Sequence, residues 1–245
     1  MRRYLAAVMT LLVSSGANTV FSRLFGRASE RPRTVLIDVG AHCGNSYRQL
    51  LSQRPWLNVS NLEAYLWEPN PVMLKWYLRD VERADHRVRV MPYAAWTANQ
   101  TMSLFLTKKD EDLQSREQYE ARQGHGCVPG EKRFGMSASS IMQNFPKTGR
   151  SVQIPTIDFL AWYRSLGLKR RDRVEFKLDA EGSEYAILGS ILDAPDGRKL
   201  WCTIDRLSVE WHHPEGSFRR SWSKTLVSRV KKQSRLCNAT VETWL

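Results

Sequence analysis

Four charged residues, Glu175, Lys177, Asp179 and Glu181, occupy every second position at the start of EFKLDAEGSEYAILGSIL, residues 175–192. Side chains of a β-strand alternate between its faces, so these four project to one side and the apolar residues between them to the other. An ammonium and several carboxylates crowded together perturb one another's pKa, as acid and base catalysts require. Lys177, Asp179 and Glu181 are therefore candidate catalytic residues, and the alternative is a structural ion-pair network.

The position of this strand decides between those interpretations. An edge strand tolerates a charged face in water. A central strand of a parallel sheet is covered on both sides, and it tolerates such a face only where its carboxyl end opens into a polar cleft.

A second chemical pattern lies in VLIDVGAHCGNS, residues 35–46, where Asp38 is followed by two glycines, Gly40 and Gly44. Glycines permit a tight turn and let backbone NH groups approach a ligand, and an acid near the strand end can hold hydroxyl or amino groups. The spacing differs from G-x-G-x-x-G, because His42 stands where the second glycine would be. A glycine-containing turn that binds no ligand is the alternative.

Glu68 lies near the end of the segment AYLWEPNP, residues 64–71, well after Gly40 in the chain. An α/β nucleoside site places a carboxylate at about this separation, where it binds the two ribose hydroxyls. The alternative is a surface acid favoured by the dipole of the next helix, for which Asn70 is the expected N-cap and Pro71 the first residue.

Two further polar residues, Glu210 and His212, fall on one face of the expected strand RLSVEWH, residues 206–212. Either side chain could take a proton from a substrate hydroxyl. His212 could equally be an exposed loop residue. Together with Asp179 and Glu181 they also form a set of hard ligands for magnesium, although no ligand spacing argues for that ion.

Short apolar runs alternate with amphipathic stretches from residue 34 onward, which is typical of βαβ units. Strands are expected at 34–40, 64–71, 87–96, 173–178, 206–212 and near 238–244, and helices at 45–54, 72–84, 156–167, 183–192 and near 217–234. The pattern predicts an α/β fold with a doubly wound, mostly parallel sheet and helices on both faces. Thr156 is expected to cap its helix and Gly167 to end it.

Residues 107–150 are polar and rich in glycine, without sustained periodicity, and predict a long loop or insertion. The chain of 245 residues with 42% hydrophobic content fits one large domain, expected over 34–245 after a leader at 1–33. Its net charge of +12 is spread over scattered Arg and Lys residues. This scatter favours a solvated basic surface and makes nucleic acid an unlikely partner.

The amino terminus, MRRYLAAVMTLLVSSGA, has two arginines, a short apolar run and then small residues, the layout of a secretory signal or a short signal anchor. The run is too short for a typical membrane span, so a membrane tether is one possibility and a mitochondrial presequence or an amphipathic leader is another. Three N-x-S/T sequons, at Asn58, Asn99 and Asn238, favour the secretory route. The alternative locations are mitochondrial and cytoplasmic.

Four cysteines lie far apart in the sequence, without a C-x-x-C pair that would indicate structural zinc or a redox motif: Cys43, Cys127, Cys202 and Cys237. They predict either two disulfides or four buried thiols.

The motifs VLIDVGAHCGNS, LWEPNP, VQIPTIDFL, FKLDAEGSEYAILGSIL and RLSVEWH, in this order and spacing, resemble the FkbM family of S-adenosylmethionine-dependent methyltransferases. The resemblance runs from about Thr34 to His212, and K-x-D-x-E-G-x-E is its most specific part. It implies a class I methyltransferase, with S-adenosyl-L-methionine over the carboxyl ends of the first strands. His42 and Cys43 depart from the small or amide-bearing residues usual in the glycine turn.

The resemblance also implies roles for individual residues. Those assigned to the cofactor are Asp38, Gly40, Ala41, His42 and Gly44 on the methionine and ribose side, and Glu68 at the ribose. Asp179 is expected beside the transferred methyl group, with Glu181, Lys177 and His212 as the other candidate catalytic residues. The family usually closes its sheet with an antiparallel hairpin, whereas this sequence has room for one more strand.

The leading hypothesis is an S-adenosylmethionine-dependent methyltransferase that O-methylates a hydroxyl of a small molecule or glycan. One alternative is a non-catalytic secreted or membrane-tethered binding domain that retains the fold. The other is an RNA methyltransferase, which the net charge permits.

Overall fold

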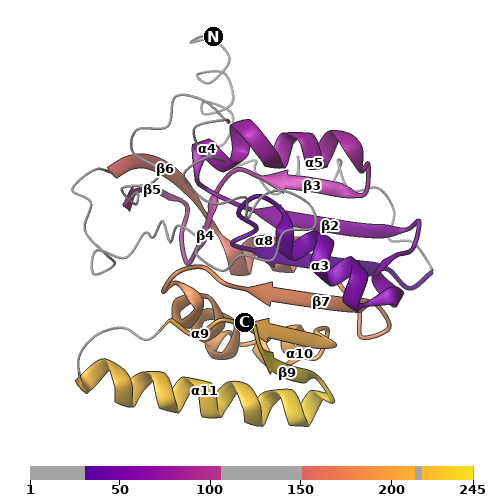
Figure 1. Cartoon of the computed structure of the whole chain (residues 1–245). Coiled ribbons are helices and arrows are strands. Elements are labelled where there is room, and N and C mark those ends of the chain that lie inside the picture. Colours follow the sequence, from indigo (N-terminus) through magenta and orange to yellow (C-terminus); the bar gives the residue numbers. More distant parts are fainter. Residues whose placement is uncertain (1–30, 106–150, 213–216, 245) are drawn as a thin grey trace.

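A six-stranded parallel sheet forms the centre of the molecule in the computed structural model, which describes residues 31–105, 151–212 and 217–244, without the side chains of 217–222 (Figure 1). The strand order is β3-β2-β1-β7-β8-β9. These strands are β1 (Thr34–Val39), β2 (Leu62–Trp67), β3 (Val88–Met91), β7 (Arg173–Leu178), β8 (Arg206–Val209) and β9 (Thr240–Thr243). With its flanking helices the sheet has a Rossmann-like, doubly wound α/β architecture, as predicted.

Helices cover both faces of this sheet, and apolar side chains of its strands pack against them on each face. They are α3 (Asn45–Gln53), α4 (Pro71–Met73), α5 (Arg79–Ala84), α8 (Phe159–Ser165), α9 (Glu184–Asp193), α10 (Gly197–Trp201) and α11 (Ser217–Cys237), with single turns η1 (Pro55–Leu57) and η2 (Leu74–Leu78). In β1, Val35 and Ile37 pack in a cluster with residues of α8, α9 and α11. Leu36 between them packs in a second cluster with Leu50 of α3 and Leu78 of η2.

Strand β7 lies between β1 and β8, so the alternating charges of EFKLD belong to a central strand. Phe176 of this strand joins the first apolar cluster. Glu175 and Lys177 are almost fully buried on the opposite face. Such a face requires charge compensation within the protein, because buried ions lose their hydration.

A smaller three-stranded sheet, in the order β4-β6-β5, adjoins the carboxyl edge of the main one. Its strands are β4 (Ala94–Trp96), β5 (Gln100–Phe105) and β6 (Ser151–Asp158). The prediction of one strand at 87–96 was wrong, because β3 ends at Met91 and the chain enters the second sheet at Ala94. Strand β5 was not predicted.

The helix predicted from Thr156 begins three residues later. The Thr156 hydroxyl donates to the carbonyl oxygen of Ala98, 2.8 Å away, and this contact holds Thr156 within β6. Asp158 is the N-cap instead, since its side chain accepts a hydrogen bond from the backbone of Ala161. Gly167 follows the helix with a positive φ of 61°, which confirms its predicted role.

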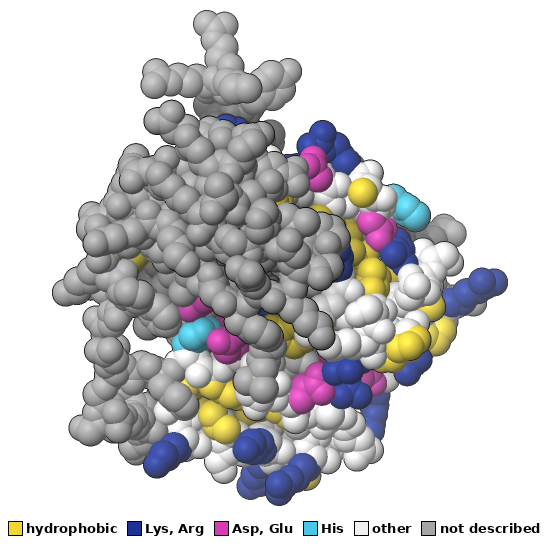
Figure 2. All heavy atoms as spheres, in the orientation of Figure 1, with side chains coloured by type: hydrophobic (Ala, Val, Ile, Leu, Met, Phe, Trp, Pro, Cys, Tyr) yellow, Lys and Arg dark blue, Asp and Glu magenta, His cyan; other side chains and the backbone are white. Residues whose placement is uncertain are grey.

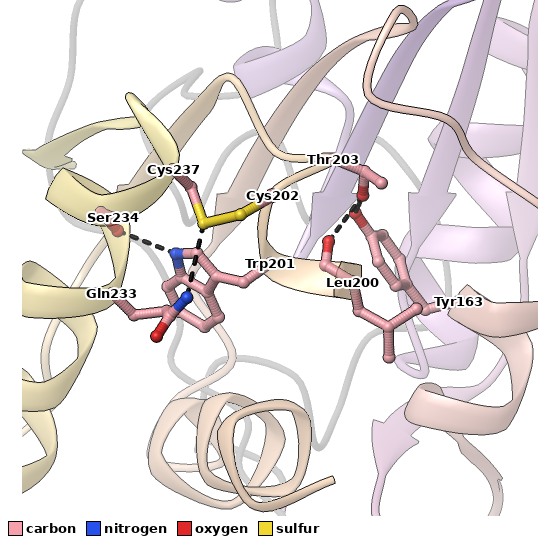
Figure 3. The surroundings of a disulfide bond; sticks show 8 residues. All are labelled: Tyr163, Leu200, Trp201, Cys202, Thr203, Gln233, Ser234 and Cys237. Carbon is pink, nitrogen blue, oxygen red and sulfur yellow. Dashed lines mark hydrogen bonds between the residues drawn. A yellow bond between two sulfur atoms is a disulfide. The ribbon is translucent and has the colours of Figure 1, made fainter. Parts of the chain in front are cut away.

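The carboxyl-terminal part is joined to the core by a disulfide between Cys202, after α10, and Cys237, the last residue of α11 (Figure 3). Beside it, the indole NH of Trp201 donates to the hydroxyl of Ser234, 2.9 Å away. Cys43 is also disulfide-bonded. These bonds agree with the disulfide alternative for the cysteines.

Strand β9 pairs with β8 in parallel and forms this edge of the sheet among the strands that the structure describes. The leader predicted at 1–33 and the loop predicted at 107–150 fall almost entirely outside the described residues. Among the helices that the structure describes, none is long and apolar enough to cross a membrane.

Candidate functional site

A cleft opens at the carboxyl ends of β1, β2 and β7, where the order of the parallel strands reverses between β1 and β7. Open α/β sheets bind their ligands at such a point. The cleft is lined by residues that follow β1 (Val39, Gly40, His42), that end or follow β2 (Trp67, Glu68, Pro69, Asn70), that belong to or precede the small sheet (Tyr93, Ala94, Ala95, Leu104) and that follow β7 (Asp179, Ala180, Glu181, Ser183).

The turn after β1 is held tightly against the ends of both neighbouring strands. The backbone NH groups of Gly40 and Ala41 both donate to the carbonyl oxygen of Trp67, each over 3.0 Å. Gly40 has a φ of 80°, and a β-carbon there would lie 1.7 Å from the carbonyl oxygen of Asp179. This position therefore requires glycine, both for its backbone conformation and for its close approach to β7.

Lys177 is buried beneath the cleft and contacts β1 and the turns that follow β1 and β7. Its ammonium lies 3.3 Å from Asp38 and 3.1 Å from Asp179, and it donates to the carbonyl oxygen of Gly40 over 2.7 Å. Burial lowers the pKa of Lys177, but the charges of Asp179 and Asp38 outweigh burial and raise it above its ordinary value. Lys177 is thus a permanently charged group that ties β1 to β7, which favours the structural interpretation of this residue.

Glu68 enters the cleft from the end of β2 in a fixed orientation. One carboxylate oxygen accepts a hydrogen bond from the backbone NH of His42 and the other from that of Asn70, each over 2.8 Å. Each carboxylate oxygen can accept more than one hydrogen bond, so these two contacts orient the group without using its full acceptor capacity. Asn70 caps the next helix through Val72, as predicted.

An acidic cluster surrounds His212 next to the cleft. Its Nδ1 atom lies 3.0 Å from the buried carboxylate of Glu184. Its Nε2 atom lies 3.2 Å from Glu181 and 3.4 Å from Glu210. Burial lowers the pKa of His212, but the hydrogen bond and charge of Glu184, together with the other carboxylates, raise it to about 9.

The prediction that Glu210 and His212 lie on one face of a strand was wrong. Strand β8 ends at Val209, and both residues follow it. With a pKa near 9, the imidazole is protonated at neutral pH. Without a bound cation it is therefore better suited to orient carboxylates than to take a proton.

Glu181 is the carboxylate of the cluster that faces the cleft. Burial raises the pKa of Glu181 to about 7. The positive charge of His212 lowers this pKa, whereas the negative charges of Asp179 and Glu184 raise it further. Glu181 and His42 adopt positive φ angles of 51° and 49°, and both line the cleft. Left-handed conformations of non-glycine residues cost free energy and concentrate at functional sites, which favours the cleft as the candidate site.

The structure thus brings together five of the residues singled out in the sequence: Gly40, His42, Glu68, Asp179 and Glu181. Asp38 and Lys177 lie buried beneath them. Ala41 is buried, and Gly44 faces Val81 and Leu78, so among the residues described neither belongs to the cleft lining.

Other residues contribute to the site without having been assigned a role in it from the sequence, although Glu184 belongs to the K-x-D-x-E-G-x-E motif and was expected near Asp179. Glu184 accepts hydrogen bonds from the backbone of Ala180 and Gly182 and fixes the turn that carries Glu181. Its position three residues after Glu181 in EGSE, at the start of a helix, was the available signal. Tyr93 and Ala95 gave no signal, because the second sheet was not expected.

Charge is distributed unevenly between the cleft and the rest of the surface. Figure 2 shows Lys and Arg side chains along the lower margin, where Figure 1 places α11. Within the part of that helix whose side chains are described, 223–237, the exposed basic residues are Lys224, Arg229, Lys231, Lys232 and Arg235. The carboxylates around His212 instead make the described part of the cleft acidic.

Comparison of the chain with protein-family models, with curated proteins and with solved structures gave no match.

Proposed function

We propose that the protein is an S-adenosylmethionine-dependent methyltransferase that O-methylates a hydroxyl of a small molecule or glycan. The observation that carries this proposal is the meeting of Glu68, the glycine turn and Asp179 in one cleft at the switch point of the sheet. Resemblance of the same segments to the FkbM family supports it further.

The residues of the cleft fit this cofactor. Glu68 presents a carboxylate, fixed by two backbone NH groups, to a ribose diol. At Gly40 a side chain is excluded, so backbone alone forms the wall between the ends of β1 and β7. Apolar lining from Trp67, Ala95 and Leu104 suits the flat face of a purine base.

When bound, S-adenosylmethionine would supply a methyl group already activated by its sulfonium for in-line displacement. The protein's own task is then to align the acceptor hydroxyl and to remove its proton. Asp179 orients the hydroxyl and is the first candidate to accept this proton, with Glu181 beside it. His212 and Lys177 hold these carboxylates in place.

The two alternative functions differ from this one in measurable ways. A non-catalytic binding domain would transfer no methyl group. An RNA methyltransferase would bind a polyanion in a salt-dependent manner, and the acidic cluster beside the cleft opposes that binding.

The disulfide between Cys202 and Cys237 supports a secretory location, since such bonds persist mainly in oxidising compartments. The asparagines of all three sequons, Asn58, Asn99 and Asn238, are exposed and therefore open to glycosylation.

A methyl-transfer assay tests the proposal. The purified protein is incubated with S-adenosylmethionine carrying a labelled methyl group and with separate pools of glycans, hydroxylated small molecules and RNA. We expect label on an oxygen of a glycan or small molecule. Label on RNA would favour the alternative enzyme, and cofactor binding without transfer in any pool would favour the binding domain.

A further inference from the structure

Three side chains with metal-binding atoms converge at the ends of β7 and β8. Asp179, Glu210 and His212 each offer one such atom, and these atoms lie within 4.8 Å of one another. Two ligands about 2.1 Å from one ion are separated by roughly 3 to 4 Å, so small side-chain rotations bring these three atoms into coordinating range.

The imidazole of His212 is oriented as it is in metal sites. Its Nδ1 atom contacts the carboxylate of Glu184, which is itself fixed by the backbone NH groups of Ala180 and Gly182. Its Nε2 atom therefore points at Glu210 and Glu181. Histidine ligands of metals usually hold a carboxylate or carbonyl at the second ring nitrogen in this way, which fixes the ring and its tautomer.

We propose that Asp179, Glu210 and His212 bind a divalent metal ion of the Mn²⁺ or Zn²⁺ class. One imidazole nitrogen with carboxylate oxygens suits these ions, whereas Ca²⁺ prefers six to eight oxygen ligands. Glu181 lies close enough to Nε2 of His212 to join the set. The Glu210 side chain is 44% exposed, so an ion can enter from solvent.

This ion would lie next to the cleft, because Asp179 belongs to both. A metal-bound hydroxyl has a lowered pKa, so the ion would help to deprotonate an acceptor alcohol, a consequence that rests on the proposed function. Metal binding itself does not depend on that function.

Metal binding is measured on the full protein after removal of metal with a chelator, without cofactor or acceptor. Mn²⁺ is titrated and followed by electron paramagnetic resonance of the free ion, and Zn²⁺ is then tested for displacement. We expect one ion per chain, with affinity weakened about 10-fold or more in Glu210→Gln and His212→Ala. Glu184→Gln should weaken binding about 10 to 100-fold, the usual effect of losing such a partner.

His86→Ala is the matched control, because it removes a histidine outside the cluster, and it should leave the affinity unchanged. Melting curves show whether each variant folds. Glu210→Gln should fold because the Glu210 side chain is half-exposed, so this variant tests the proposal even where another variant does not fold. Absence of saturable binding up to about 1 mM, or binding that these variants do not alter, would overturn the proposal. Failure of methyl transfer alone would leave the metal result intact, and so separates the two proposals.

Discussion

The carbonyl oxygen of Asp179 occupies the space that a side chain on Gly40 would need, with only 1.7 Å between that oxygen and a β-carbon built on the glycine. The same segment is held to β1 by a 3.0 Å hydrogen bond from the backbone NH of Asp179 to the carbonyl oxygen of Val39. The glycine turn and the candidate catalytic segment are therefore positioned by each other.

Gly40→Ala should destabilise the protein by more than about 3 kcal/mol, because it adds a backbone clash to an unfavourable positive φ. Gly189→Ala is the matched control. That glycine lies within α9 with open space around its β-carbon position, so alanine should stabilise the helix by about 0.5 to 1 kcal/mol. Denaturant unfolding of both variants measures the difference, and equal stabilities would show that the close approach is relieved by small backbone shifts.

Glu175→Gln should raise stability at neutral pH. Burial raises the pKa of Glu175 to about 7, although Arg54 and Arg206 oppose it. A carboxyl with a raised folded-state pKa contributes stability below its unfolded value, and this contribution is lost as pH rises through about 7. The variant should therefore gain roughly 1 to 3 kcal/mol relative to wild type between pH 5 and pH 8.

Glu242→Gln should change stability at neutral pH in the opposite direction to Glu175→Gln. Burial raises the pKa of Glu242, but its hydrogen bonds with Ser208 and Arg206 outweigh burial and hold the pKa below its usual value. Its stabilising contribution is present at neutral pH and is lost in acid, so this variant should be less stable than wild type at pH 7. Matching pH profiles for the two variants would refute the assigned environments.

Asp179→Asn should lower turnover by roughly 100-fold or more, the usual scale for an acid or base group, while cofactor affinity changes much less. The melting temperature should change little, because Lys177 keeps its contacts with Asp38 and with the carbonyl of Gly40. Asp38→Asn should instead reduce the free energy of unfolding by about 1 to 3 kcal/mol, since that buried carboxylate contacts both Lys177 and Ser46. Parallel loss of activity and melting temperature in Asp179→Asn would make its role structural.

Expression in eukaryotic cells should give a product whose electrophoretic mobility shifts after glycosidase treatment. The three sequons are removed one at a time by Ser60→Ala, Thr101→Ala and Thr240→Ala, which leave the asparagine backbones unchanged. Each substitution should remove one step of the shift, because each asparagine is exposed. A cytosolic product without any shift would contradict the secretory location.

The main sheet could be predicted from the sequence because its strands are rich in apolar residues and alternate with helical segments along the chain. Of the alternating charges of 175–181, Asp179 and Glu181 reach the cleft, as expected for groups at and after the carboxyl end of a covered strand. Glu175 and Lys177 are instead buried, where Arg54, Arg206 and Asp38 compensate their charges. Asn70 begins its helix and Gly167 ends its helix as predicted, because capping depends on local chemistry.

The second sheet could not be predicted, because its strands pair over long separations that local patterns do not report. The local sequence predicts Thr156 as a helix cap, but its hydroxyl instead donates to the carbonyl oxygen of Ala98, far away in the sequence. The contact of Glu184 with His212 is hidden for the same reason, since the two residues meet only after β7 and β8 have paired.

Calorimetric titration of S-adenosylmethionine tests the central claim most directly. We predict binding of one cofactor per chain, weakened by about 1 to 3 kcal/mol in Glu68→Gln through loss of charge-assisted hydrogen bonds to the ribose. Glu63→Gln, which changes a partly exposed acid at the opposite end of the same strand, should bind as wild type does. Absence of binding to the wild type, or equal affinity in the wild type and Glu68→Gln, would contradict this assignment of the cleft.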